Sequence, residues 1–264
     1  MSAPLPDAAT IKQRLIENLK AMQAEQERYL CRVTRHREET DKNGNVKKSA
    51  VKTYDMFYVH GQEIDQMIAK DGRPLDASQQ KKESERVQKE IADDSDEKHL
   101  AKAQAENNKQ LDTLLHALRF TNGHRQMLNG RATLGYDLMG DPSFHPKNVP
   151  ETFLHNMTGT VQMDEATSQL IDLNAHLDHD VKIGGGLLAN VHKGLWLHVH
   201  QVRQPDGVWI NDLAEGKGDA RAALFLHPYF QFQQTTSDCH LTNVTTQTSE
   251  SHIADSVNKE KKTP

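Results

Sequence analysis

The chain has 264 residues, of which 36% are hydrophobic and 5% aromatic, and its formal net charge is -5. This length fits one β-rich domain or two smaller ones, and a mean hydropathy of -0.76 predicts that much of the chain is solvated helix, loop or tail. The mild acidity offers no basic surface for nucleic acid, so we expect none as a partner. We also expect no transmembrane span, because no run approaches about 18 apolar residues. The N-terminus lacks the apolar segment of a signal peptide, and export stays open because a removed leader leaves no trace.

The opening of the chain is predicted to form a helix followed by three strands. Thr10 and Gln13 match a capping box, and apolar residues then recur at helical spacing. Alternating apolar and polar residues follow, and Asn43-Gly44 supplies the residues of a tight hairpin turn. The expected elements are a helix over about 11–28 and strands over 29–40, 46–59 and about 62–69.

A polar helical arm is predicted over about 76–118. The stretch is rich in strong helix formers and has only a thin apolar stripe, and Asp76 or Ser78 can cap it. Charge pairs such as Lys81 with Glu85 support it at four-residue spacing. The simplest interpretation is a solvated helix face, and the alternative is a mobile lid or a partner-binding arm.

The second half of the chain is predicted to consist mainly of strands. Turn residues occur at Asn122-Gly123, at Asn129-Gly130 and from Asp164 to Thr167, and Gly184 to Gly186 are expected to join two strands of the sheet wall. Residues 141–150 are expected to form a loop, and 242–264 a disordered tail. One expected strand lies between the two Asn-Gly pairs, and the others cover about 132–138, 159–163, 169–177, 195–202, 208–215, 217–227 and 229–240.

No residue pattern in this chain predicts catalysis or a cofactor. The three glycines lack the Gly-Lys-Ser/Thr of a phosphate loop, and no GxSxG motif is present. His198 and His200 fall on one face of a predicted strand, so a metal site with a third ligand from His192, His176 or His179 is a minor alternative to ordinary polar-face histidines. We therefore expect neither enzyme activity nor a cofactor.

The two cysteines, Cys31 and Cys239, form no CxxC motif. Two buried free thiols are the simpler interpretation. The alternative is a bridge between an early and a late strand, which requires an oxidising compartment.

Apolar side chains on the predicted sheet are the candidate ligand contacts. If helices cover only part of one sheet face, these side chains line a cavity, whereas complete cover makes them core. The candidates are Leu134, Tyr136, Leu138, Ile171, Leu173, Leu195, Leu197 and Val199.

The runs YDMFYVHGQEIDQMIAKDGRPL, GTVQMDEATSQLIDLNAHL and KIGGGLLANVHKG carry a family resemblance. In their order and turn placement they resemble bacterial outer-membrane lipoprotein-sorting proteins, the LolA- and LolB-like carriers, over roughly residues 10–240. The resemblance implies an α+β fold: a curved antiparallel sheet forming an incomplete β-barrel, with helices covering the concave side. It also implies one such domain over residues 1–241, a periplasmic location and a lipid or lipoprotein acyl chain as ligand.

Three functional hypotheses follow from the residues and the resemblance together. The first is a non-enzymatic periplasmic carrier or binding protein for lipoprotein acyl chains or other hydrophobic ligands. The second is an envelope protein–protein interaction module that keeps the fold with a filled core and binds no lipid. The third, and weakest, is a histidine metal-binding protein.

Overall fold

The computed structural model describes residues 4–41, 45–59, 62–93, 97–183, 189–222 and 229–242. Over these ranges the chain forms one large antiparallel sheet with helices on it, so the predicted α+β class is confirmed. None of the helices in these ranges is long and apolar enough to cross a membrane.

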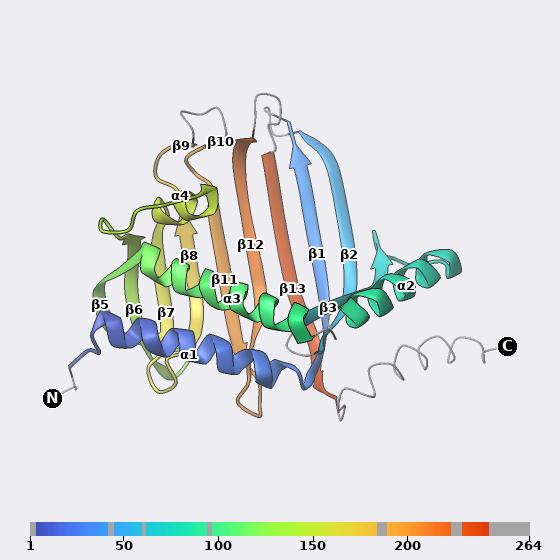
Figure 1. Ribbon diagram of the computed structural model, residues 1–264, viewed down its shortest axis with the longest axis horizontal. Helices are drawn as coiled ribbons and strands as arrows, with labels where there is room; N and C mark the ends of the chain where they lie inside the picture. The colour runs from blue at the N-terminus through green and yellow to red at the C-terminus, as the bar shows by residue number, and fades with distance from the viewer. Residues whose placement is uncertain are drawn as a thin grey trace.

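The sheet is built from a path of eleven strands that does not close into a barrel. Its order is β4-β3-β2-β1-β13-β12-β11-β8-β7-β6-β5, and the short pair β9–β10 joins it through β12. The first and last long strands, β1 and β13, are therefore neighbours in the middle of the sheet (Figure 1). The strands are β1 (Tyr29–Thr40), β2 (Val46–Val59), β3 (Gln62–Lys70), β4 (Arg73–Pro74), β5 (Leu118–Leu128), β6 (Arg131–Gly140), β7 (Thr158–Asp164), β8 (Leu170–His176), β9 (Val181–Ile183), β10 (Ala189–Val191), β11 (Trp196–Arg203), β12 (Trp209–Ala222) and β13 (Tyr229–Leu241).

Three of the helices lie over one face of the sheet, which we call the helix-covered face (Figure 1). They are α1 (Ala8–Gln26), α3 (Glu97–Ala117) and α4 (Val149–His155). The remaining helix, α2 (Ala77–Asp93), lies beside β3 at one end of the sheet. We call the other side of the sheet the open face.

The helix boundaries correct two details of the sequence prediction. The first helix begins at Ala8, because Asp7 and not Thr10 is its N-cap: the Asp7 carboxylate accepts the Thr10 backbone N–H at 2.9 Å. The polar arm is two helices, α2 and α3, and Asp76 caps the first by accepting the Gln79 backbone N–H at 2.8 Å. The predicted loop over 141–150 ends in the start of α4, which the sequence analysis missed.

The turn predictions had mixed outcomes. Asn129-Gly130 forms a turn with positive φ at both residues, as its sequence predicts. Asn122-Gly123 does not: it lies within β5, at a register shift where the backbone passes close to the Tyr136 ring, and a Cβ on Gly123 would be 2.6 Å from that ring. The predicted strands over 208–215 and 217–227 are, as far as they are described, one continuous strand, β12. The predictions for Asn43-Gly44 and for Gly184 to Gly186 lie outside the described residues.

The main core lies between the sheet and the helices α1 and α3. Ile11 and Leu15 from α1 and Leu115 from α3 are buried against the side chains of β5, β6 and β7. At about 25 cal/mol per Å2 of apolar surface removed from water, such contacts fix which face of each helix meets the sheet. The sheet members of this cluster are Phe120, Leu134, Tyr136, Leu138, Val161 and Met163.

Cys31 and Cys239 form a disulfide between β1 and β13. The free-thiol interpretation was wrong, because strand pairing that is invisible in the sequence brings the two positions together. Their Cα atoms are 4.1 Å apart although 208 positions separate them along the chain.

Candidate functional site

A groove with a volume of about 720 Å3 lies between α1, α3 and α4. Binding sites for small molecules typically enclose about 300–1,000 Å3, so the groove is large enough for one ligand. Its apolar lining is Leu19, Met22, Leu111, Leu114 and Leu154, and its polar lining is Lys20, Gln104, Asn107, Asn108 and Gln110.

The lining residues of α1 continue the stripe that packs that helix on the sheet. Ile11 and Leu15 are buried, whereas Leu19, one turn later, is only partly covered by the core. Met22 follows Leu19 at helical spacing, and its sulfur accepts a hydrogen bond from the Gln169 side chain at 3.1 Å. The stripe thus leaves the packed core and enters the groove toward the C-terminal end of α1.

Below this end of α1, buried amides hold the helix to the sheet. The Gln169 amide donates to Gln201 at 3.1 Å, and the Gln201 amide donates to Asn211 at 2.7 Å. Gln26 donates to the backbone carbonyl of Trp209 at 3.1 Å. Because buried polar groups without partners are costly, this chain of amides fixes the position of the helix that forms one wall of the groove.

The opposite wall is α3, which is packed tightly at one end only. Among its described side chains, Leu115 and Ala117 are buried, and both belong to its last turn. Leu111 and Leu114 are half-buried and border the groove. The helix therefore presents apolar side chains to a space that its own packing does not fill.

Of the eight residues predicted to line a cavity, seven lie in strands of the sheet and Leu195 directly precedes β11, and none is among the lining residues of this groove. Leu134, Tyr136 and Leu138 are buried in the core beneath α1, and Leu173 packs against the same cluster. Ile171, also buried, lies at a register shift between β7 and β8.

The other three predicted lining residues belong to the region around β11. Leu195 is buried in a separate cluster with Met157 and Leu177. Leu197 and Val199 are half-buried, and they pair across the strands with Ala175 and Leu173, which places them on the helix-covered face. Contact of any of the eight with a ligand remains a prediction.

The groove residues themselves gave partial signals in the sequence. Leu19, Met22, Leu111 and Leu114 belong to apolar stripes at helical spacing, which predict helices but do not tell a packed position from a groove-lining one. Leu154 was missed with α4. The sequence does contain a start signal for α4, namely Asn148 followed by Glu151 three positions later. In the structure Asn148 is the N-cap and accepts the Glu151 backbone N–H at 2.9 Å.

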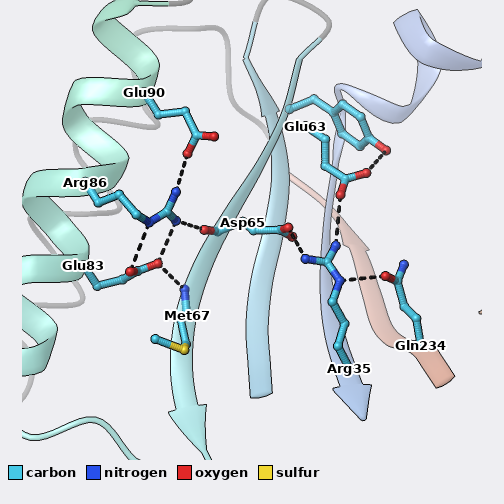
Figure 2. Close-up of polar contacts among 9 residues, drawn as sticks. Arg35, Glu63, Asp65, Met67, Glu83, Arg86, Glu90 and Gln234 are labelled. Atoms are coloured by element: carbon cyan, nitrogen blue, oxygen red, sulfur yellow. Dashed lines mark hydrogen bonds and ion pairs between the residues drawn. The ribbon is translucent and has the colours of Figure 1, made fainter. Parts of the chain in front are cut away.

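A polar cluster lies near β1, β2 and β3 (Figure 2). It is on the helix-covered face, because Arg35 pairs across the strands with Gln234, in register with Val199. The Arg35 guanidinium donates to the carboxylates of Asp65 and Glu63 and to the Gln234 side chain. Burial and the neighbouring Asp65 charge raise the pKa of the Glu63 carboxyl. The cavity beside Glu63 and Tyr58 measures about 30 Å3, which is about the volume of one water molecule, so this cluster is a packed polar network.

Helix α2 binds the free edge of β3 through two charged side chains (Figure 2). Glu83 accepts the Met67 backbone N–H at 2.8 Å, and Arg86 donates to the Asp65 backbone carbonyl. Arg86 also pairs with Glu83 and Glu90. The carboxylate and the guanidinium thus occupy the places that the carbonyl and the N–H of a further strand would take.

The histidines of β11 lie on the open face and pair with carboxylates. His198 contacts Asp172 at 2.8 Å and Glu215 at 3.3 Å, and His200 contacts Asp212 at 2.6 Å. Across the described ranges, no three His, Cys, Asp or Glu residues are arranged to hold a metal ion. The proposed third ligands have other contacts: His192 with Asp180, His176 with Asp178 and His179 with Asn156.

The protein is thus an open antiparallel sheet with helices over one face and an apolar groove between those helices. No family model and no curated protein matches the chain. Among solved structures, a crystal structure of MucB in complex with MucA(peri) is similar over 90% of this chain and 100% of that chain, at 9% sequence identity and a TM-score of 0.25. This degree of similarity does not assign a function.

Proposed function

We propose that this chain is a non-enzymatic periplasmic carrier or binding protein for lipoprotein acyl chains or other hydrophobic ligands. The observation that carries the proposal is the groove between α1, α3 and α4, with five apolar side chains in its lining. Each methylene that leaves water contributes about 0.8 kcal/mol, so an acyl chain gains affinity along its length.

The packing of α3 supports a carrier that also releases its ligand. Because the buried side chains described in α3 belong to its last turn, the rest of the helix can move away from the groove at modest cost. The longer apolar stripe of α1 keeps the other wall in place.

The disulfide supports the proposed periplasmic location. Disulfides form and persist in oxidising compartments, including the bacterial periplasm, and are rare in the reducing cytosol. The Cys31–Cys239 bridge joins two central strands, so it belongs to the folded sheet and not to a loose terminus.

Binding of a fluorescent fatty acyl probe to the purified protein tests the proposal. We expect saturable binding to the wild type and an affinity about tenfold lower for Leu111→Gln, which places an amide in the apolar lining. Met127→Gln is the matched control, because Met127 is 68% exposed on β5, away from the groove. A wild-type protein that binds no hydrophobic probe would contradict the proposal.

The second candidate, an envelope protein–protein interaction module, is favoured by the filled core under α1 and by the mostly exposed surface of α2. Charge reversal at the exposed positions Lys82 and Lys89 of α2 tests it. Loss of a purified partner's binding on Lys82→Glu and Lys89→Glu, with no hydrophobic ligand bound by the wild type, would favour this candidate over the carrier.

A further inference from the structure

The polar part of the groove lining is unusual for this acidic chain. The lining contains one ammonium group, that of Lys20, and four side-chain amides, but no carboxylate and no guanidinium. The whole chain carries 37 Asp and Glu residues against 32 Lys and Arg. The groove therefore combines an apolar surface with hydrogen-bond donors and one positive charge.

The donors in the groove are not used by the protein itself. Within the described part of the chain, the Lys20 ammonium has no carboxylate in ion-pair range, and the amides of Gln104, Asn107, Asn108 and Gln110 have no side-chain hydrogen-bond partner. Asn107 is half-buried and the other four side chains are exposed. Lys12 on the same helix is different, because its ammonium donates to the Leu118 carbonyl at 2.6 Å and so holds α1 to β5. Of these two α1 lysines, Lys20 is the one available to a ligand.

We propose that the groove binds a single-chain amphiphile with a carboxylate head, that is, a fatty acid. Its hydrocarbon chain lies along the five apolar side chains, and its carboxylate meets the Lys20 ammonium and the amide donors of α3. One ammonium balances one carboxylate charge. A phosphate monoester head carries between one and two negative charges at neutral pH, which the single ammonium of the lining does not balance. The inference rests on the proposed function and specifies its ligand class.

The test is isothermal titration calorimetry of the full chain with dodecanoate, dodecanol and dodecyl phosphate, which share one hydrocarbon chain. We expect dodecanoate to bind the wild type more tightly than dodecanol does. Lys20→Gln should weaken dodecanoate binding by up to about fivefold, as expected for loss of an ion pair with an exposed lysine, and leave dodecanol binding unchanged.

The matched control is Lys109→Gln. Lys109 precedes the groove residue Gln110 on α3 but is not part of the lining, so its loss removes the same charge without removing a head-group contact. Dodecanoate affinity should be the same in Lys109→Gln and in the wild type. An equal loss in both variants would show that the effect is overall charge, and it would overturn the inference.

The remaining outcomes separate this inference from the proposed function. If dodecanol binds as tightly as dodecanoate and Lys20→Gln changes neither, the carboxylate assignment fails while the hydrophobic-ligand proposal stands. If dodecyl phosphate binds more tightly than dodecanoate, the carboxylate assignment also fails. If none of the three amphiphiles binds the wild type, both proposals fail.

Discussion

At the scale of single residues, Asp164 is a buried charge on which the β7–β8 turn depends. Its side chain is 1% exposed, and it accepts hydrogen bonds from Thr167 at 2.9 Å and from the Arg131 guanidinium at 2.6 Å. Burial alone would raise the pKa of Asp164, but the backbone N–H of Thr167 and the charge of Arg131 outweigh it, and the net pKa is lowered. Because the pKa of Asp164 is lower in the folded state, its ionised carboxylate stabilises the fold at pH values above the ordinary pKa of 3.8.

We predict that Asp164→Asn lowers the free energy of unfolding by about 1–3 kcal/mol at neutral pH, because it leaves the Arg131 charge without its partner. The difference from the wild type should shrink as the pH falls below about 4, where the wild-type carboxylate also becomes protonated. Urea unfolding of both proteins, at neutral pH and below about pH 4, measures this difference in the free energy of unfolding. Asp112→Asn, at an exposed position of α3, serves as the control and should stay close to the wild type.

The stability contribution of His198 is predicted to depend on pH in the opposite direction to that of Asp164. Burial alone would lower its pKa, but Asp172 and Glu215 on either side raise the pKa above the ordinary 6.5. The charged imidazole therefore contributes stability that is fully present below the ordinary value and is lost as the pH rises through the raised one. An NMR titration should find His198 protonated at pH values where a free imidazole is neutral, and Asp172→Asn should bring the midpoint down. A midpoint that Asp172→Asn leaves unchanged would count against this assignment.

At the scale of elements, α2 protects the edge of the sheet. An unprotected edge strand offers N–H and C=O groups to another chain, and β3 has these groups occupied by Glu83 and Arg86. We predict that the double substitution Glu83→Ala with Arg86→Ala promotes self-association through β3, detected as concentration-dependent dimers in analytical ultracentrifugation. Lys81→Ala with Glu85→Ala removes an exposed α2 pair whose charges are 3.9 Å apart and should stay monomeric to the same extent as the wild type. Equal sedimentation of both double variants would argue against edge protection.

The sequence predicted elements best where a single rule decides them. The bounds of β1 and β2 agree with the predicted 29–40 and 46–59, because a period of two over a long run leaves little freedom of register. The charge run of α2 was predicted to be a solvated face, yet Glu83 within it is 8% exposed. Its partners are backbone groups of a distant strand edge, and local charge spacing cannot predict such a contact.

The candidate site was harder to predict from the sequence than the fold. Candidate ligand contacts were sought on the sheet, where alternation marks an inward face, and residues such as Leu134 do face inward but meet Ile11 and Leu15 of α1. The groove arises because α3 leaves Leu111 and Leu114 only partly covered. That depends on how two helices and α4 are spaced over the sheet, which no single stretch of sequence contains.

At the scale of the whole molecule, the disulfide joins the two ends of the described fold. Among the described elements, β1 follows the first helix and β13 is the last strand, so the bridge closes most of the chain into one loop, with the two cysteines 208 positions apart. In the chain-entropy model, closing a loop longer than about 100 residues stabilises the folded state by about 4–5 kcal/mol.

We therefore predict that Cys31→Ala with Cys239→Ala lowers the free energy of unfolding by about 3–5 kcal/mol in urea titrations. A reducing agent should bring the wild type toward the variant and leave the variant unchanged, because only the wild type has a bond to lose. Equal stability of the oxidised wild type and the variant would instead mean that strand pairing alone holds β1 against β13.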